Sequence, residues 1–358
     1  MSGYDEFLGT RPVADAHRFD IGALERYLRS NIDGFAGPIE VAQFKGGQSN
    51  PTFVLTTPGK RYVLRRKPPG QLLPSAHAVD REYRVISALA HTDVPVPRTY
   101  CLCTDDAVIG TMFYVMELVE GRVLWDPLLP GMEPSQRGAI FDEMNRVIAA
   151  LHRVDYTALG LESFGKPGNY FGRQIDRWTR QYQASATDTI DAMDRLIEWL
   201  PANIPKGEQI AIVHGDYRLD NMVFHPTEPL VLAVLDWELS TLGHPLADFS
   251  YHMMTWRLAP NEFRGLRGSN LAALGIPDEQ QYLAMYLRRV GAATAPDPQE
   301  WNFYLAYNMF RMAGILQGVK ARALAGNAAS AQALEAGSRA RPMAELGWQQ
   351  VESMRTGH

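Results

Sequence analysis

The chain has 358 residues, of which 46% are hydrophobic and 21% are charged, and its formal net charge is −5 at pH 7. This length suits two domains of ordinary size, and the apolar fraction excludes a disordered chain. The acidic excess argues against a nucleic-acid-binding surface, because such surfaces need clustered Lys and Arg.

The sequence also bears on the compartment. Cys101 and Cys103 are the only cysteines, and two residues at this spacing make a poor disulfide and too few ligands for zinc. The N-terminus lacks a basic stretch followed by an apolar one, and no stretch approaches the roughly 18 apolar residues of a membrane span. We therefore expect a soluble, cytoplasmic protein without membrane association.

The first third of the chain has the pattern of a small mixed domain. Apolar spacing predicts a helix over residues 19–32, for which Asp20 is a suitable N-cap. A helix capped by Ser75 is expected later, with Glu82 on its otherwise apolar face. β-type runs before and after it predict a five-stranded antiparallel sheet, at residues 39–44, 52–57, 61–66, 99–104 and 113–118.

Helical patterns dominate the rest of the chain. They cover residues 136–152, 171–183, 187–200, 245–259, 279–290, 300–323 and 328–354. Short strand-like runs interrupt them at 210–213, 222–224 and 230–235. We therefore expect an α+β protein with an N-lobe over 1–119 and a mostly helical C-lobe over 120–358.

The most informative motif runs from His214 to Asn221 and is followed by Asp236-Trp237-Glu238. Phosphoryl transfer from a nucleotide needs a carboxylate near the acceptor hydroxyl and oxygen ligands that hold Mg²⁺ against the phosphates. Asp216 stands five residues before Asn221, and Asp236 follows a hydrophobic strand. This spacing is typical of a protein-kinase-like active site, although a polar turn explains either motif alone.

The loop at residues 45–50 is the candidate phosphate clamp. Gly46 and Gly47 would let backbone N–H groups approach phosphates, and Ser49 would add a hydroxyl. The loop departs from G-x-G-x-x-G, and a double-glycine hairpin is also an ordinary turn. It therefore supports a nucleotide site only together with the other motifs.

Arg65 stands where a kinase carries its phosphate-pairing lysine. Arginine is always charged and bidentate, so it suits the same role. Lys67 has the same strand parity and is the alternative. Because Glu82 would be costly as an unpaired charge on an apolar helix face, we predict an Arg65–Glu82 ion pair rather than a solvated Arg65.

A buried strand is predicted to run into a connector at residues 114–121. An adenine ring would bond the backbone there between Glu117 and Val119, although a core strand followed by an ordinary loop explains the same pattern. The sequence contains no G-x-x-x-x-G-K-[ST], no G-x-G-x-x-G and no G-x-S-x-G motif. The connector is therefore the candidate adenine site.

Several residues near these motifs have simpler interpretations. We expect Asp248 to brace the catalytic loop, and His214 and His244 to be hydrogen-bonded structural histidines. Glu238 is expected to be a surface carboxylate, with tuning of the metal site as the alternative. The aromatic series at 301–311 is expected to be core, with an acceptor pocket as the alternative.

Six motifs occur in order along residues 35–260. They are Gly46-Gly47-x-Ser49, Val63-Leu64-Arg65, Arg81-Glu82-Tyr83, His214-Gly215-Asp216-x4-Asn221, Asp236-Trp237-Glu238 and Gly243-His244-Pro245-Leu246-x-Asp248. As a set they resemble the aminoglycoside phosphotransferase and choline kinase-like superfamily. The resemblance implies a bilobal protein-kinase-like fold, ATP and Mg²⁺. It also implies Asp216 as catalytic base, Asn221 and Asp236 as metal ligands, and Arg65 with Glu82 at the phosphates.

A narrower set of motifs points to one branch of that superfamily. It comprises Lys67-Pro68-Pro69-Gly70, Leu73-Pro74-Ser75-Ala76-His77, Asn169-Tyr170-Phe171 with Gln174, Arg177 and Trp178, and Gly243-His244-Pro245. The set resembles the branch whose animal members are fused to acyl-CoA dehydrogenase-like domains, which implies a hydroxyacyl-CoA acceptor. No such domain is in this sequence, so an acyl-CoA dehydrogenase-like partner is expected as a separate chain.

We therefore predict an ATP- and Mg²⁺-dependent small-molecule kinase whose C-lobe carries the catalytic loop, metal site and acceptor pocket. An aminoglycoside or choline is the alternative acceptor. Residues 251–358 carry 11 Lys and Arg against 8 Asp and Glu, a net +3, which disfavours a polycationic acceptor. Two alternatives belong to other functional classes. One is a non-catalytic nucleotide-binding scaffold, and the other is a hydrolase that uses Asp216 and His214.

Overall fold

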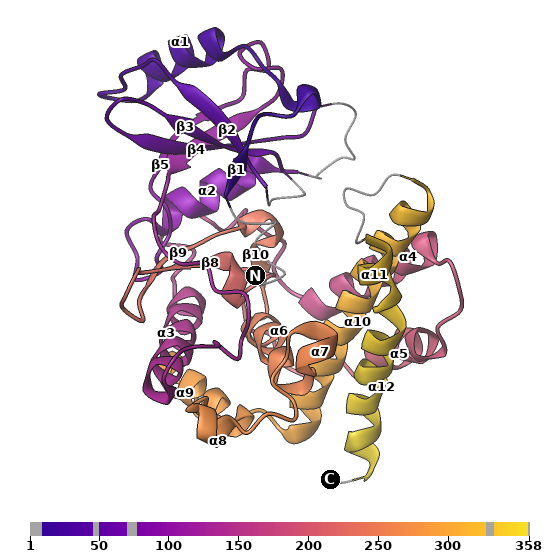
Figure 1. Ribbon diagram of the computed structural model, residues 1–358. Coiled ribbons are helices and arrows are strands. Elements are labelled where there is room, and N and C mark those ends of the chain that lie inside the picture. The colour runs from indigo at the N-terminus through magenta and orange to yellow at the C-terminus, as the bar shows by residue number, and fades with distance from the viewer. Residues whose placement is uncertain (1–8, 46–49, 70–76, 327–332, 357–358) are drawn as a thin grey trace. The chain divides into compact units, whose positions relative to one another are not determined.

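The computed structural model describes residues 9–45, 50–69, 77–326 and 333–356 (Figure 1). Contacts between residues divide the chain into two compact units. The first unit comprises Met1–Trp125, Thr157–Phe164 and Leu219–Ser240, and the second comprises Asp126–Tyr156, Gly165–Arg218 and Thr241–His358. The predicted lobes are two continuous segments, 1–119 and 120–358, whereas each compact unit is made of three segments. The division into these two lobes stays a prediction.

The first unit contains an antiparallel sheet with the strand order β1-β2-β3-β4-β6-β5. Its strands are β1 (Thr10–Arg11), β2 (Glu40–Phe44), β3 (Thr52–Thr56), β4 (Arg61–Arg66), β5 (Thr99–Cys103) and β6 (Phe113–Glu117). The five predicted strands are confirmed. Strand β1, which pairs with β2, is a sixth strand and corrects the predicted number of five. It is not predicted from the sequence because two residues are too few to show an alternating pattern.

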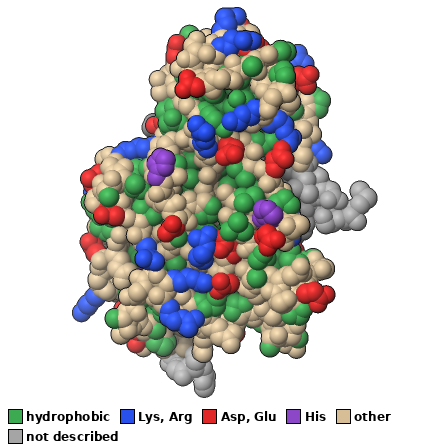
Figure 2. All heavy atoms as spheres, turned by 90° about the vertical axis from the view of Figure 1, so that its left-hand side faces the viewer, with side chains coloured by type: hydrophobic (Ala, Val, Ile, Leu, Met, Phe, Trp, Pro, Cys, Tyr) green, Lys and Arg blue, Asp and Glu red, His purple; other side chains and the backbone are tan. Residues whose placement is uncertain are grey.

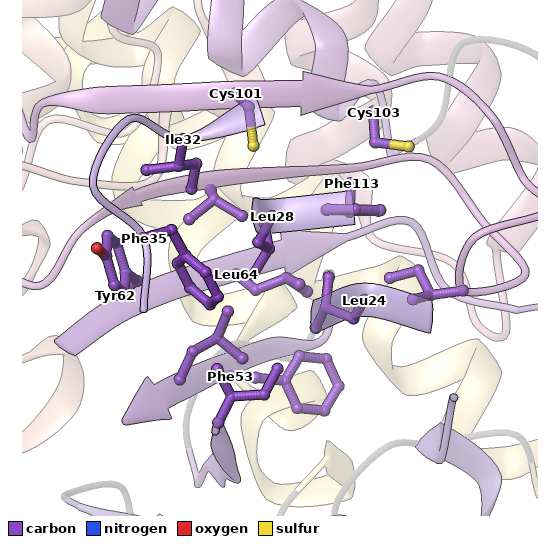
Figure 3. Close-up of a cluster of buried hydrophobic side chains, with 14 residues drawn as sticks. Leu24, Leu28, Ile32, Phe35, Phe53, Tyr62, Leu64, Cys101, Cys103 and Phe113 are labelled. Atoms are coloured by element: carbon purple, nitrogen blue, oxygen red, sulfur yellow. The ribbon is translucent and has the colours of Figure 1, made fainter. Parts of the chain in front are cut away.

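Helix α1 (Ile21–Asn31) packs on one face of this sheet. The Asp20 carboxylate accepts from the Ala23 N–H at 2.9 Å, as expected of an N-cap. Leu24 and Leu28 are fully buried in a cluster with sheet residues that include Phe53, Leu64 and Phe113 (Figure 3). Each buried leucine contributes about 1.5–3 kcal/mol, so this cluster holds α1 on the sheet.

Side chains alternate between the two faces of the sheet along β4. Tyr62 and Leu64 belong to the α1 cluster, so Arg65 points to the opposite face. Helix α2 (Val79–Leu89) contacts the neighbouring strands β5 and β6. It begins after Ala78, whereas Ser75, the predicted cap, lies outside the described residues.

A second small sheet completes the first unit. Strands β8 (Met222–Phe224) and β9 (Val231–Val234) form an antiparallel hairpin at the predicted positions. The 3-10 helix η2 (Leu219–Asn221) precedes it, and the 3-10 helix η3 (Trp237–Leu239) follows it and contacts α2. The C-terminal end of the hairpin therefore leads to α2.

The second unit is mostly helical. Its helices are α3 (Pro134–His152), α4 (Tyr170–Ser185), α5 (Asp191–Ala202), α6 (Pro245–Arg257), α7 (Pro260–Phe263), α8 (Leu271–Leu274), α9 (Glu279–Val290), α10 (Pro298–Leu324), α11 (Ala333–Ser338) and α12 (Ala340–Thr356). Helix α10 contacts α4, α5, α6, α11 and α12. Its aromatic series is buried, so core packing accounts for that pattern.

The second unit differs from expectation in two places. Strand β10 (Thr241–Gly243), which is not predicted from the sequence, pairs with β7 (Ala211–Val213). Its residues Thr-Leu-Gly carry no apolar alternation that would indicate a strand. The helix predicted over 328–354 is divided into α11 and α12 around Arg339, and residues 327–332 lie outside the described part of the chain.

The surface carries charges of both signs. Figure 2 shows Lys and Arg side chains lying among Asp and Glu side chains on one face, as totals of 35 basic and 40 acidic residues imply. Within the described ranges, none of the helices combines the length and the apolar character needed to cross a membrane.

Candidate active site

Arg65 is the centre of a charged cluster in the first unit. Its Nε lies 2.9 Å from Glu82 Oε2, and its Nη2 lies 2.6 Å from Asp236 Oδ1. The Arg65 side chain is 10% exposed and that of Glu82 only 1%. The predicted Arg65–Glu82 ion pair is confirmed, and the guanidinium fork lets the same side chain reach a second carboxylate.

Two neutral side chains complete the surroundings of Glu82. Asn50 Nδ2 donates to Glu82 Oε1 at 2.9 Å, and Tyr114 Oη donates to Oε2 at 3.1 Å. Neither hydrogen bond is predicted from the sequence. The strand register is the signal that finds Tyr114, because it lies directly opposite Arg65 in β6 and so shares its face of the sheet.

Burial acts on the two charged partners in different ways. It raises the pKa of Glu82, against the opposing effect of Arg65. Burial by itself would lower the pKa of Arg65, but the charges of Glu82 and Asp236 raise it more. Arg65 is therefore a permanent cation.

The cluster has an excess of negative charge. Glu238 corrects an expectation: its side chain is 23% exposed, and it lies 3.5 Å from Arg65 Nη2 and 3.4 Å from Asn50 Nδ2. With Glu82 and Asp236 it makes three carboxylates against one guanidinium, a formal charge of +1 − 3 = −2. Such an excess in a partly buried site favours binding of a further cation.

The predicted metal ligands lie at the two ends of the β8–β9 hairpin. Asn221 ends η2 directly before β8, Asp236 follows β9, and the Leu235 N–H donates to the Asn221 carbonyl at 2.8 Å. Asp236 has a φ of 64°, a left-handed conformation that costs a non-glycine residue about 1–3 kcal/mol and often marks a functional site. The hairpin therefore brings the two segments together.

These ligands suit a magnesium ion that is also bound to phosphate. Carboxylate and amide oxygens are hard ligands, and Mg²⁺ in nucleotide sites is bound by one or two carboxylates plus phosphate oxygens. Among the described residues, no group of three or more His, Cys, Asp or Glu side chains is placed to hold a metal. The oxygen donors of Asn221 and Asp236 are of the type that could hold Mg²⁺ together with phosphate oxygens.

Asp216 lies in the second unit, in the loop after β7. Asp248, in the first turn of α6, accepts from the N–H groups of His214 and Gly215 at 2.7 and 2.8 Å. Burial alone would raise the pKa of Asp248, but the hydrogen bond and charge of His152, whose Nε2 lies 3.2 Å away, lower it. The prediction that Asp248 braces this loop is confirmed.

The two predicted structural histidines are buried and hydrogen-bonded. His214 Nδ1 accepts from the Asp216 N–H at 3.1 Å, and His244 Nδ1 accepts from the Leu246 N–H at 3.3 Å. Burial lowers the pKa of His244 to about 4, so this ring is neutral near pH 7. Both rings stabilise local backbone, as predicted.

Two side chains that are not predicted from the sequence hold the loop after β7. Tyr251 Oη donates to Asp216 Oδ1 at 2.5 Å, and Arg311 Nη2 donates to the Gly215 carbonyl at 2.5 Å. Arg218 Nε lies 3.9 Å from the same Asp216 oxygen. Helices α6 and α10 thus both contact the loop.

The remaining predicted contacts concern the nucleotide. Gly46, Gly47 and Ser49 lie outside the described residues. The Glu117 N–H donates to the Arg98 carbonyl at 2.8 Å, and Val119 lies beyond the end of β6. The roles of all five residues stay predictions.

Comparison with a family model identifies the type of protein. Residues 40–295 match the model of the phosphotransferase enzyme family. A solved Ralstonia eutropha protein, described as a candidate aminoglycoside phosphotransferase, is 61% identical with a TM-score of 0.86, over 94% of this chain and 99% of that one.

Two more distant similarities cover nearly the whole chain. Choline kinase from Cryptosporidium parvum has a TM-score of 0.67 at 13% identity, over 94% of this chain and 97% of that chain, which shows the fold alone. Mouse acyl-CoA dehydrogenase family member 10 is 48% identical over 97% of this chain, which spans only 33% of that relative. The solved structures confirm the predicted kinase-like fold. The match to the family model confirms the predicted family.

Proposed function

The chain belongs to the phosphotransferase enzyme family, and from that premise we propose that it is an ATP- and Mg²⁺-dependent kinase acting on a hydroxyl group of a small molecule. The observation that carries this proposal is the acidic cluster around Arg65, which lies beside the ends of the hairpin that presents Asn221 and Asp236. Asp216 stands five residues before Asn221 in the same chain segment.

Each residue has a role in the proposed transfer. The acceptor oxygen bonds to the γ-phosphorus, the bond from that phosphorus to ADP breaks, and Asp216 takes the hydroxyl proton. Arg65, oriented by Glu82, holds the phosphates. Asn221 and Asp236 would hold Mg²⁺, which neutralises phosphate charge when bound.

The nucleotide contacts complete the proposal. Gly46, Gly47 and Ser49 supply backbone and hydroxyl donors to the phosphates. The connector between Glu117 and Val119 receives the adenine ring. Each of these assignments rests on the order of motifs in the sequence.

For the acceptor, we propose a hydroxyacyl-CoA. Support comes from the 48% identity, over nearly the whole chain, to part of a relative named acyl-CoA dehydrogenase family member 10. The net +3 of residues 251–358 suits an anionic acceptor. An acyl-CoA dehydrogenase-like protein is the partner that this proposal implies. An aminoglycoside is the second candidate, because the 61% identical Ralstonia protein is described in those terms.

The test is ATP consumption with Mg²⁺ against 4-hydroxyacyl-CoA esters, kanamycin, choline and homoserine. We expect turnover with the acyl-CoA esters and none in Asp216→Asn. Turnover with kanamycin alone would show that the acceptor is an aminoglycoside and that the proposed reaction, phosphate transfer to a hydroxyl group, is correct. ATP binding without transfer to any acceptor would support a non-catalytic scaffold, and ester cleavage without ATP would support a hydrolase.

A further inference from the structure

The proposed base is held by a residue from outside the predicted motifs. Tyr251 lies on α6, is 4% exposed, and donates from its Oη to Asp216 Oδ1 at 2.5 Å. We propose that Tyr251 is a positioning residue that fixes the plane of the Asp216 carboxylate for the acceptor hydroxyl. This inference rests on the proposed role of Asp216 as the base.

The tyrosine is a permanent donor. Burial raises the pKa of Tyr251, and the neighbouring charge of Asp216 raises it further, against the smaller opposing effects of Arg218 and Arg311. The phenol therefore stays protonated near neutral pH, and toward an ionised carboxylate it can only donate. A buried donor of this kind restricts rotation of the carboxylate without adding a positive charge.

Arg311 holds the tyrosine and the loop together. Its guanidinium lies 5.1 Å from the centre of the Tyr251 ring and 5.6 Å from that of Trp178. The same side chain, 7% exposed, donates to the Gly215 carbonyl. The backbone before Asp216 and its carboxylate are thus tied to residues that pack against each other, so both are ordered before substrate binds.

Tyr251→Phe tests this role because it keeps the ring beneath Arg311 and removes only the hydroxyl. We expect kcat to fall about tenfold to 100-fold through loss of alignment, with little change in the KM for ATP or in Tm. Tyr282→Phe is the matched control. Tyr282 is also buried in the second unit, but its Oη lies 2.9 Å from His252 Nε2, so we expect wild-type kcat.

The outcomes separate the inference from the proposed function. Wild-type kcat in Tyr251→Phe, an equal loss in Tyr282→Phe, or a loss of kcat matched by a large fall in Tm would each overturn the positioning role. A wild-type protein that transfers phosphate to no acceptor would instead overturn the proposed function, and this inference with it.

Discussion

The two units hold their candidate carboxylates in different ways. In the first unit, Glu82 and Asp236 share the guanidinium of Arg65 at 2.9 and 2.6 Å. In the second unit, Asp216 receives its short hydrogen bond from a neutral phenol, and Arg218 stays 3.9 Å away. Ion pairs suit a cluster that binds charged ligands, whereas the hydrogen bond from a phenol orients the carboxylate of a proposed base without itself adding a charge.

Asp216→Asn tests the second half of this comparison and has the largest expected effect. The amide cannot take the hydroxyl proton, so we expect kcat to fall about 1,000-fold. Nucleotide affinity, measured by calorimetry, should stay within about twofold, since the residues proposed to contact the phosphates lie in the other unit. Loss of ATP binding in this variant would contradict the division of roles.

Asp248→Asn removes the charge that braces the catalytic loop. An amide offers one acceptor where the carboxylate receives two backbone N–H groups, so we expect about 3 kcal/mol less stability to unfolding by urea. Asp176→Asn is the control, because Asp176 is 65% exposed in a surface pair with Arg180 and should cost under about 1 kcal/mol.

The Asp248 effect also has a defined dependence on pH. The pKa of Asp248 is lower in the folded chain than its ordinary value. Its stabilisation is therefore complete above the ordinary pKa and is lost as the pH falls through the folded pKa. The difference in stability between wild type and Asp248→Asn should shrink in that acid range, and a difference that grew there would contradict the assignment.

Glu82→Gln weakens the first unit's cluster. It keeps the shape of the side chain but removes one charge beside Arg65, so we expect about 2 kcal/mol less stability and a KM for ATP raised about tenfold. Glu25→Gln is the matched control, because Glu25 pairs with Arg29 within helix α1 and takes no part in the Arg65 cluster. An unchanged KM for ATP in Glu82→Gln would show that the Arg65–Glu82 ion pair does not contribute to nucleotide binding.

Arg65→Lys has the smallest expected effect. A single ammonium keeps the charge but cannot reach Glu82 and Asp236 with separate nitrogens, so we expect the KM for ATP to rise about threefold to tenfold, with kcat less affected. Arg61→Lys, on the same strand but 49% exposed, should match the wild type. Equal kinetics in Arg65→Lys would favour Lys67 as the phosphate ligand.

The elements that sequence analysis recovers are those with a repeating pattern. The five longer strands of the main sheet and the helix at Ile21–Asn31 carry several periods of apolar residues, and all of them form. The strands Thr10–Arg11 and Thr241–Gly243 carry no apolar pattern of their own, and each is held by hydrogen bonds from a strand distant in sequence, Glu40–Phe44 and Ala211–Val213 respectively.

The candidate site also has features that the sequence predicts and features that it does not. The sequence by itself determined the spacing of Asp216, Asn221 and Asp236, and the Arg65–Glu82 pair, because chain order and a charge on an apolar face are local signals. Only the tertiary structure decided the roles of Tyr251 and Arg311, which meet the loop from 35 and 96 residues away. Both look like core residues in their own helices, and a hydrogen bond between distant segments leaves no local pattern to detect.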